Sequence, residues 1–84
     1  MAELTLKSHR FRAEREADWR RLETLLARVE RGGARRLSKD ELVEMPVLYR
    51  QALSSLSVAR AISLDQQLVG YLESLCSRSY FFGP

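Results

Sequence analysis

Hydrophobic positions recur at helical spacing along most of this chain. In residues 9–31 they fall within one narrow arc of a helix with 3.6 residues per turn, so this segment buries one side. The arc contains Phe11, Asp18, Trp19, Leu22, Leu25, Leu26 and Val29. Ser8 can cap the segment, and Gly32 and Gly33 follow it, where glycine readily takes the positive φ that ends a helix. We therefore predict a first helix over 9–31.

A capping box marks the next boundary. Ser38 and Glu41 have the spacing at which each side chain bonds the other residue's backbone amide, with Leu37 and Leu42 around them. Pro46 follows within two turns, and proline suits the first turn of a new helix because it has no amide proton. We predict a short helix over 39–45 and a bend at Pro46.

Two further segments complete the pattern. Residues 46–62 are apolar on most of the circumference, which is typical of a central helix, and residues 64–82 carry one apolar side after a weaker capping box at Ser63 and Gln66. No segment alternates like a strand. We predict an all-α fold in one domain, 1–84: a small antiparallel helical bundle of three long helices and one short helix, over about 9–31, 39–45, 46–62 and 64–82.

Composition places the chain among small globular proteins. Its 84 residues suffice for one domain, and 45% hydrophobic with 30% charged residues is ordinary for a folded chain. Cys76 is the only cysteine, so an intramolecular disulfide is excluded and a cytoplasmic location is favoured. No uncharged run approaches the ~20 residues that span a bilayer.

The far side of the first helix is basic. An arc of roughly 100° on a helix of 3.6 residues per turn holds five arginines and no acidic residue of that helix. We predict that this face binds an acidic protein partner or the anionic inner face of the cell membrane, where each basic residue gains about 1 kcal/mol. The residues are Arg10, Arg20, Arg21, Arg28 and Arg31.

Three other interpretations of the surface remain open. The arginine row is also the pattern by which a small helical protein binds nucleic acid, although a net charge of +3 is small for that role. A merely solvated arginine face is the plainest interpretation. Excess apolar surface on 46–62 and 64–82 would instead allow self-association.

Chemistry-bearing residues are sparse. His9 and Cys76 are the only residues of their kinds and lie near opposite ends of the chain, and a catalytic Cys/His pair would also need a third group to orient the histidine and a pocket for substrate. The carboxylates lack the spacing of a zinc or calcium site, and no glycine-rich phosphate loop is present. We therefore expect no enzyme activity, cofactor or metal. Arg60, at the edge of an apolar arc, is predicted to pair with Asp18.

Three stretches, RFRAEREADWRRLETLL, LSKDELVEMPVLYRQALSSLSVARA and SLDQQLVGYLESLCSRSYFF, together resemble the N-terminal cytosolic segment of the stage II sporulation protein M family. The likeness covers roughly Leu6 to Phe82. It implies a bacterial, membrane-associated interaction module, because in that family the segment precedes several membrane spans and some members act with partners in peptidoglycan remodelling. It implies no catalytic residue. This chain stops at Gly83-Pro84, so a truncated membrane protein and a free-standing domain are both expected possibilities.

Overall fold

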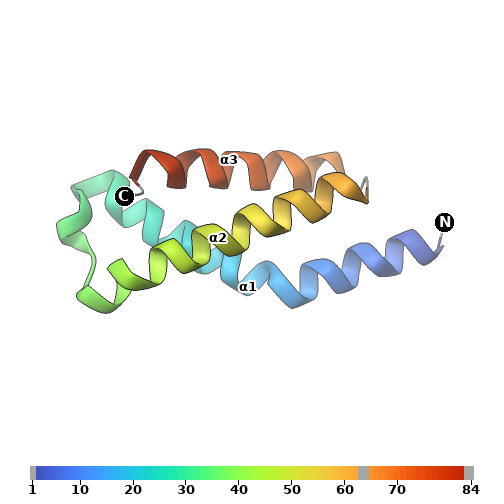
Figure 1. The fold of residues 1–84 in the computed structure, drawn as a ribbon, viewed down its shortest axis with the longest axis horizontal. Helices are drawn as coiled ribbons and strands as arrows, with labels where there is room; N and C mark the ends of the chain where they lie inside the picture. Colours follow the sequence, from blue (N-terminus) through green and yellow to red (C-terminus); the bar gives the residue numbers. More distant parts are fainter. Residues whose placement is uncertain (1, 63–64, 83–84) are drawn as a thin grey trace.

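The computed structural model of the protein describes residues 2–62 and 65–82, with side chains from Lys7 onward. Three α-helices, α1 (Ala2–Gly32), α2 (Lys39–Ala61) and α3 (Gln66–Phe82), run up, down and up, and a 3-10 turn, η1 (Ala34–Arg36), joins α1 to α2. They form an elongated bundle of 46 × 19 × 18 Å (Figure 1). The all-helical prediction is confirmed, since none of the described residues forms a strand.

The first helix is longer than predicted. It begins at Ala2 rather than at residue 9, so Ser8 lies within the helix instead of capping it. Ala, Glu, Leu and Lys are strong helix formers and dominate residues 2–7, which explains the early start. In Figure 1 these first turns extend past the ends of α2 and α3. The other end is as predicted: Gly33 has φ 82°, and its N–H donates to the Val29 carbonyl at 2.7 Å.

The predicted capping box is present at the start of α2. The Glu41 amide donates to Ser38 Oγ at 3.1 Å, and the Ser38 amide donates to Glu41 Oε1 at 2.9 Å. Leu37, which precedes the box, is buried in the core. The turn after α1 is therefore fixed both by its own hydrogen bonds and by packing.

The predicted break at Pro46 is wrong. Pro46 lies inside α2, and the expected helices 39–45 and 46–62 are one continuous helix of 23 residues. The parts of α2 on either side of the proline bury the same face of the helix. Met45 precedes the proline on this face, and Leu48 and Ala52 follow it. Packing of this shared stripe outweighs the local preference of proline to start a helix. The bundle thus has three long helices, and its short fourth element is η1.

The start of α3 uses a different cap from the predicted one. Asp65 Oδ1 accepts a hydrogen bond from the Gln67 amide at 2.8 Å, and the helix begins at Gln66 rather than at residue 64. Ser63 and Leu64, on which the prediction depended, lie outside the described residues. An aspartate in this position satisfies an amide of the first turn that has no partner within the helix.

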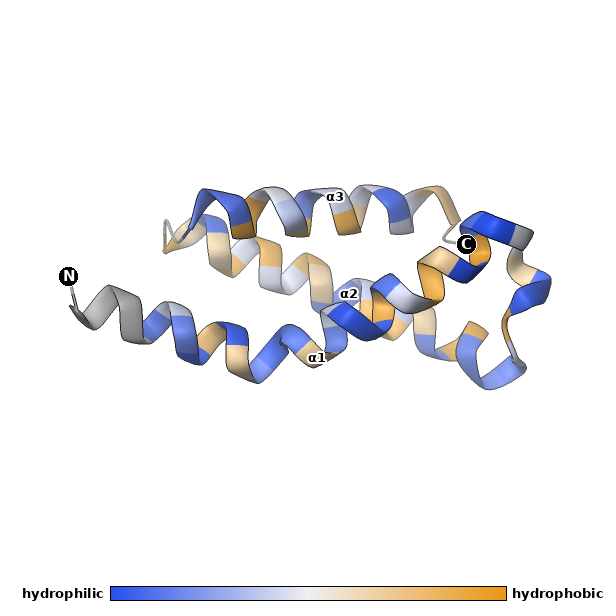
Figure 2. Ribbon diagram, turned by 180° about the vertical axis from the view of Figure 1, so that it is seen from behind, coloured by the Kyte–Doolittle hydropathy of each residue, from blue (hydrophilic) through white to orange (hydrophobic). Residues whose placement is uncertain are grey.

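The core runs along the line where the three helices meet. Trp19, Leu22, Leu25, Leu26, Leu72 and Leu75 are its largest fully buried side chains. Figure 2 shows hydrophobic residues on the inner sides of the helices and hydrophilic residues at the connection between α1 and α2. Within the described ranges, no helix has the length and apolar character needed to cross a bilayer.

The predicted pair of Arg60 and Asp18 does not form. Arg60 lies on the side of α2 that borders α3, and its Nη2 is 2.7 Å from Glu73 Oε2. Asp18 is exposed, although it belongs to the apolar arc of α1 by helical spacing, because it lines an open groove between α1 and α2. The residue spacing within α1 correctly identified its apolar arc. It could not show at which positions α2 leaves that arc exposed.

Candidate basic docking face

The five predicted arginines do not form one continuous face. At 100° per residue, Arg21 and Arg28 lie on the flank of α1 that borders α2, whereas Arg20 and Arg31 lie nearly opposite the buried stripe. The acidic residues that face the first pair come from α2, so they are absent from a projection of α1 alone. The predicted arc therefore divides into two arginines that are bound to α2 and others that are not.

Arg21 is bound to α2 at two points. Its Nε and Nη2 donate to the two oxygens of Glu44, each at 3.0 Å, and Nη2 is also 3.6 Å from Glu41 Oε2. The hydrogen bonds from Arg21 lower the pKa of the Glu44 carboxyl, and the bond to Glu44 raises that of the guanidinium. This planar two-point geometry is the arrangement in which arginine binds a carboxylate most specifically. Arg21 is consequently part of the contact between α1 and α2.

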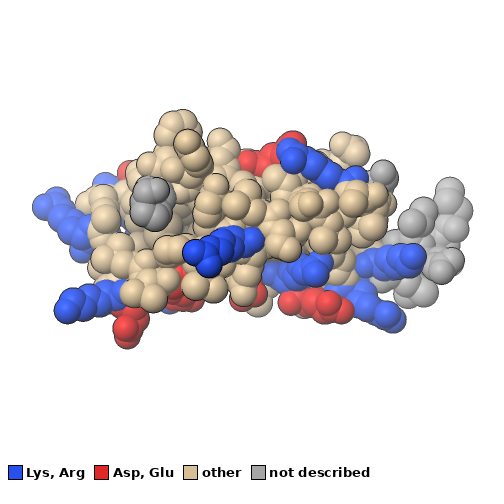
Figure 3. All heavy atoms as spheres, in the orientation of Figure 1, with Lys and Arg blue, Asp and Glu red and all other residues tan. Residues whose placement is uncertain are grey.

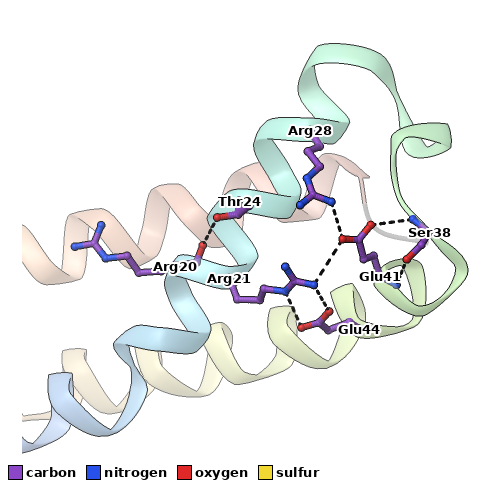
Figure 4. Close-up of polar contacts among 7 residues, drawn as sticks. All are labelled: Arg20, Arg21, Thr24, Arg28, Ser38, Glu41 and Glu44. Carbon is purple, nitrogen blue, oxygen red and sulfur yellow. Dashed lines mark hydrogen bonds and ion pairs between the residues drawn. The ribbon is translucent and has the colours of Figure 1, made fainter.

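Arg28 makes a second contact of this kind. Its Nη1 donates to Glu41 Oε2 at 2.6 Å, while the other oxygen of Glu41 accepts the Ser38 amide (Figure 4). The Ser38 amide first, and Arg28 second, lower the pKa of the Glu41 carboxyl below its ordinary value. One carboxylate thus caps α2 and holds α1 beside it.

Three of the predicted arginines, Arg10, Arg20 and Arg31, form no ion pair with α2 among the described side chains. Arg20 points away from the cluster of Arg21, Arg28 and Glu41 in Figure 4, and its only ion pair within the described side chains is with Glu16 of its own helix, at 3.6 Å. Arg10 and Arg31 form no ion pair with any described side chain. Arg10 lies about 15 Å from Arg20 along the axis, at 1.5 Å per residue, so it belongs to a separate part of α1.

A shallow groove of about 480 Å³ runs along the exposed half of α1. Arg20 and Arg31 stand at its two ends, three turns apart, with the small side chain of Ala27 between them. It is lined by Arg20, Glu23, Thr24, Ala27, Arg28 and Arg31. Two exposed arginines that the sequence reasoning did not single out, Arg35 and Arg36, follow in η1 and add positive charge at the same end of the bundle.

Glu23, which also lines the groove, is hydrogen-bonded to α3. Its Oε1 accepts a hydrogen bond from the Tyr71 hydroxyl at 2.8 Å. Burial, and then the bond to Glu23, raise the pKa of Tyr71 to about 12. Arg78 of α3 bonds both oxygens of Glu30, at 2.8 and 2.7 Å, and thereby lowers the pKa of that carboxyl. These contacts between α1 and α3 have no signature in the sequence, because the partners are 48 residues apart.

A buried hydrogen bond joins α1 to the middle of α2. Trp19 Nε1 donates to Ser55 Oγ at 3.1 Å, and both residues are 2% exposed. Arg15, one turn before Trp19, stacks its guanidinium 4.4 Å from the centre of the Phe11 ring. The bond was not predicted. The available signal was the position of Ser55 within the apolar stripe of α2, where a serine needs a polar partner.

The residues considered for catalysis lie in different environments. His9 is exposed on α1, whereas Cys76 is buried in the core on α3, and burial raises the pKa of its thiol. Among the side chains from Lys7 to Ile62 and Asp65 to Phe82, no three His, Cys, Asp or Glu residues cluster as a metal site would require. Within the described part of the chain, the arginine groove is therefore the site with the clearest chemistry.

Comparison with known proteins identifies the chain at the level of a family. No curated protein and no solved structure matches it. One family model, described as a domain of unknown function (DUF8413), matches residues 9–82, a range that contains all five predicted arginines and the carboxylates that bind two of them. Since this match covers nearly the whole bundle, the chain belongs to the DUF8413 family.

Proposed function

We propose that the protein is a non-enzymatic helical interaction module that docks an acidic surface of a partner protein on the outer face of α1. The groove between Arg20 and Arg31 is the observation that carries this proposal. Arg20 and Arg31 are three turns apart and exposed, and the nearby Arg35 and Arg36 extend the positive field toward η1. Carboxylates on a partner surface are the groups that arginines in such an arrangement bind best.

A protein fits this face better than a lipid bilayer does. Binding at a membrane surface needs apolar side chains beside the basic ones, which enter the boundary of the acyl chains. The exposed large hydrophobic residues of the described chain belong to α2, to α3 and to Ile62, which follows α2, and α1 contributes none. Lipid remains a second outcome of the test.

A nucleic acid is less well matched. Nucleic-acid binding by α1 would require the five predicted arginines to contact successive phosphates. Two of them, Arg21 and Arg28, are bound to carboxylates of α2. The three predicted arginines that are left, Arg10, Arg20 and Arg31, do not form a continuous row along α1.

We propose further that the module is the soluble N-terminal part of a bacterial membrane protein similar to stage II sporulation protein M, on the cytoplasmic side. The sequence likeness over Leu6 to Phe82 supports this setting. The nucleotide sequence downstream of the Pro84 codon tests it. In-frame apolar spans would support the proposal, and a stop codon directly after Pro84 would refute it.

The docking proposal is tested by charge reversal with a fluorescent decaglutamate peptide as the probe. We expect the double variant Arg20→Glu/Arg31→Glu to weaken binding at low salt by about tenfold, which is the scale of two exposed charge contacts. The matched control is Lys39→Glu/Arg50→Glu, which makes the same change of net charge on α2. Arg21 and Arg28 are unsuitable for reversal, because a glutamate there would face Glu44 and Glu41 and loosen the bundle.

Three outcomes separate the interpretations. An equal loss in both double variants would show attraction by net charge alone and would refute a site on α1. Binding to vesicles of phosphatidylcholine with phosphatidylglycerol, but not to the peptide, would identify lipid instead. A shift of duplex DNA at low salt that depends on Arg20 and Arg31 would favour nucleic acid.

A further inference from the structure

The end of the bundle that holds η1 also holds the exposed aromatic residues of α3. Three consecutive aromatic residues form the last turn of this helix, and they are 73%, 79% and 45% exposed: Tyr80, Phe81 and Phe82. Arg78 bonds Glu30 in the last turn of α1 at 2.7 Å, so the aromatic turn lies beside the end of α1 (Figure 1). We call this end of the bundle the η1 tip; it consists of residues 31–40 and 80–82.

The two most exposed rings of the described chain form a pair at this tip. Tyr80 and Phe81 contact each other in an edge-to-face arrangement, with ring centroids 6.4 Å apart. Neither ring belongs to the buried core cluster. Their apolar surface is therefore available to a partner outside the molecule, and burial of that surface would be favourable.

The η1 tip carries the whole net charge of the protein. Residues 31–40 hold four of the 14 Lys and Arg residues and one of the 11 Asp and Glu residues, so ten basic and ten acidic residues remain elsewhere. The four basic residues are exposed and form no ion pair with any described side chain: Arg31, Arg35, Arg36 and Lys39. Figure 3 shows Lys and Arg side chains standing out from this end of the molecule. The tip is therefore the part that a negatively charged surface attracts.

Basic and aromatic side chains together match the interface of an anionic bilayer. Aromatic rings are enriched at the level of the headgroups, and a basic residue near anionic lipid gains free energy. The groove on α1 has arginines but no exposed large hydrophobic residue, whereas the tip has both. An acidic protein surface would bind the basic residues and leave the rings in water. Single-stranded nucleic acid needs ring faces on which successive bases stack, and an edge-to-face pair offers no such continuous stack.

We propose that the η1 tip binds the surface of a lipid bilayer that contains anionic lipid. Tyr80 and Phe81 enter the boundary between headgroups and acyl chains, and the basic residues of the tip contact lipid phosphates. The elongated bundle then contacts the bilayer with one end rather than with a long side. This contact is separate from the docking of a protein on α1, with which it shares only Arg31 among the residues at the two ends of the groove.

Co-sedimentation with lipid vesicles tests the role of charge. We expect the full chain to bind vesicles of phosphatidylcholine with about one third phosphatidylglycerol at least about tenfold more tightly than vesicles of phosphatidylcholine alone. Arg35→Gln/Arg36→Gln should weaken this binding by about tenfold. Lys7→Gln/Arg50→Gln is the matched control, because it makes the same change of net charge at exposed positions outside the tip, and it should leave binding nearly unchanged. Circular dichroism establishes that each variant is folded.

Tryptophan fluorescence tests which part of α3 enters the bilayer. Phe81→Trp places the probe in the tip, and Gly70→Trp is the matched control. Gly70 is exposed on the same side of α3, 11 residues and about 16 Å before Phe81, and a side chain there meets no described atom within 4 Å. Anionic vesicles should shift the emission of Phe81→Trp to shorter wavelength and leave that of Gly70→Trp unchanged. Trp19 is buried and contributes a constant background.

The aromatic pair is tested by Tyr80→Ser/Phe81→Ser, which should weaken binding to anionic vesicles by about tenfold. The same variant should leave decaglutamate binding unchanged, so failure of this proposal and failure of docking on α1 are distinguishable. Four results would overturn the proposal: equal binding to both kinds of vesicle, an equal loss in the two charge variants, an equal emission shift in the two tryptophan variants, or no vesicle binding at all. Binding of oligothymidylate in place of vesicles, lost in Tyr80→Ser/Phe81→Ser, would overturn it in favour of nucleic acid.

Discussion

The hydrogen bond between Trp19 and Ser55 allows a stability prediction with a worked magnitude. The indole N–H of Trp19 is buried and donates to Ser55 Oγ at 3.1 Å, so replacement of Ser55 by alanine leaves this N–H without its acceptor. A buried N–H without a partner costs about 1–3 kcal/mol. Alanine returns up to about 0.5 kcal/mol through its better helix propensity. We therefore expect Ser55→Ala to lower the free energy of unfolding by about 1–2 kcal/mol.

Urea unfolding followed by far-ultraviolet circular dichroism measures this loss, and thermal unfolding should show a fall in Tm of about 4–8 °C for each kcal/mol in a domain of this size. Ser54→Ala is the control. Ser54 is exposed beside the same groove and forms no side-chain hydrogen bond among the described residues, so its replacement should be neutral or slightly stabilising.

A double-mutant cycle with Trp19→Phe isolates the bond itself. Phenylalanine has no N–H, so Ser55→Ala should cost about 1 kcal/mol less in the Trp19→Phe background than in the original chain. Strictly additive effects would refute the reasoning. So would equal stability of Ser55→Ala and Ser54→Ala, because it would mean that the buried N–H finds another acceptor at no cost.

Three other predictions follow from contacts within the bundle. The pKa values of the carboxylates that bind arginine, Glu30, Glu41 and Glu44, lie below the ordinary value for glutamate. The stability that these ion pairs provide is therefore present above about pH 4.5 and is lost as the pH falls through the lowered pKa values. Replacing the three glutamates by glutamine should flatten this part of the dependence of the free energy of unfolding on pH. An ultraviolet titration should show a tyrosine that ionises near 12, and Tyr71→Phe should remove it. Pro46→Ala should raise the free energy of unfolding, by up to about 3 kcal/mol, because α2 is continuous through this position; a loss of stability would show that a bend there is needed.

Local rules predicted the helices well where one short stretch decides the outcome. The capping box needs only the four residues from Ser38 to Glu41, and Gly33 ends α1 by its own conformational freedom. Pro46 shows the limit of such rules. Its local preference for a helix start was outweighed by a stripe of buried residues on both sides, which only the packed bundle reveals.

The candidate site was harder to predict for a related reason. A projection of α1 correctly separated the apolar arc from the arginines, but it contained no information about acids on other helices. Glu41 and Glu44 face Arg21 and Arg28 only after the chain has turned back on itself. The same limit applies to Asp18, which has the spacing of a buried residue and is exposed because α2 leaves that position uncovered.

The double role of Glu41 has a consequence for how the molecule opens. Its carboxylate bonds both the Ser38 amide and Arg28, so unwinding of the first turn of α2 also breaks a contact with α1. We expect fraying, which normally begins independently at each helix end, to be coupled across the two helices. In hydrogen exchange, we expect amides from both sides of η1 to lose protection together, as a single hairpin-sized unit, while the other end of α1 exchanges separately.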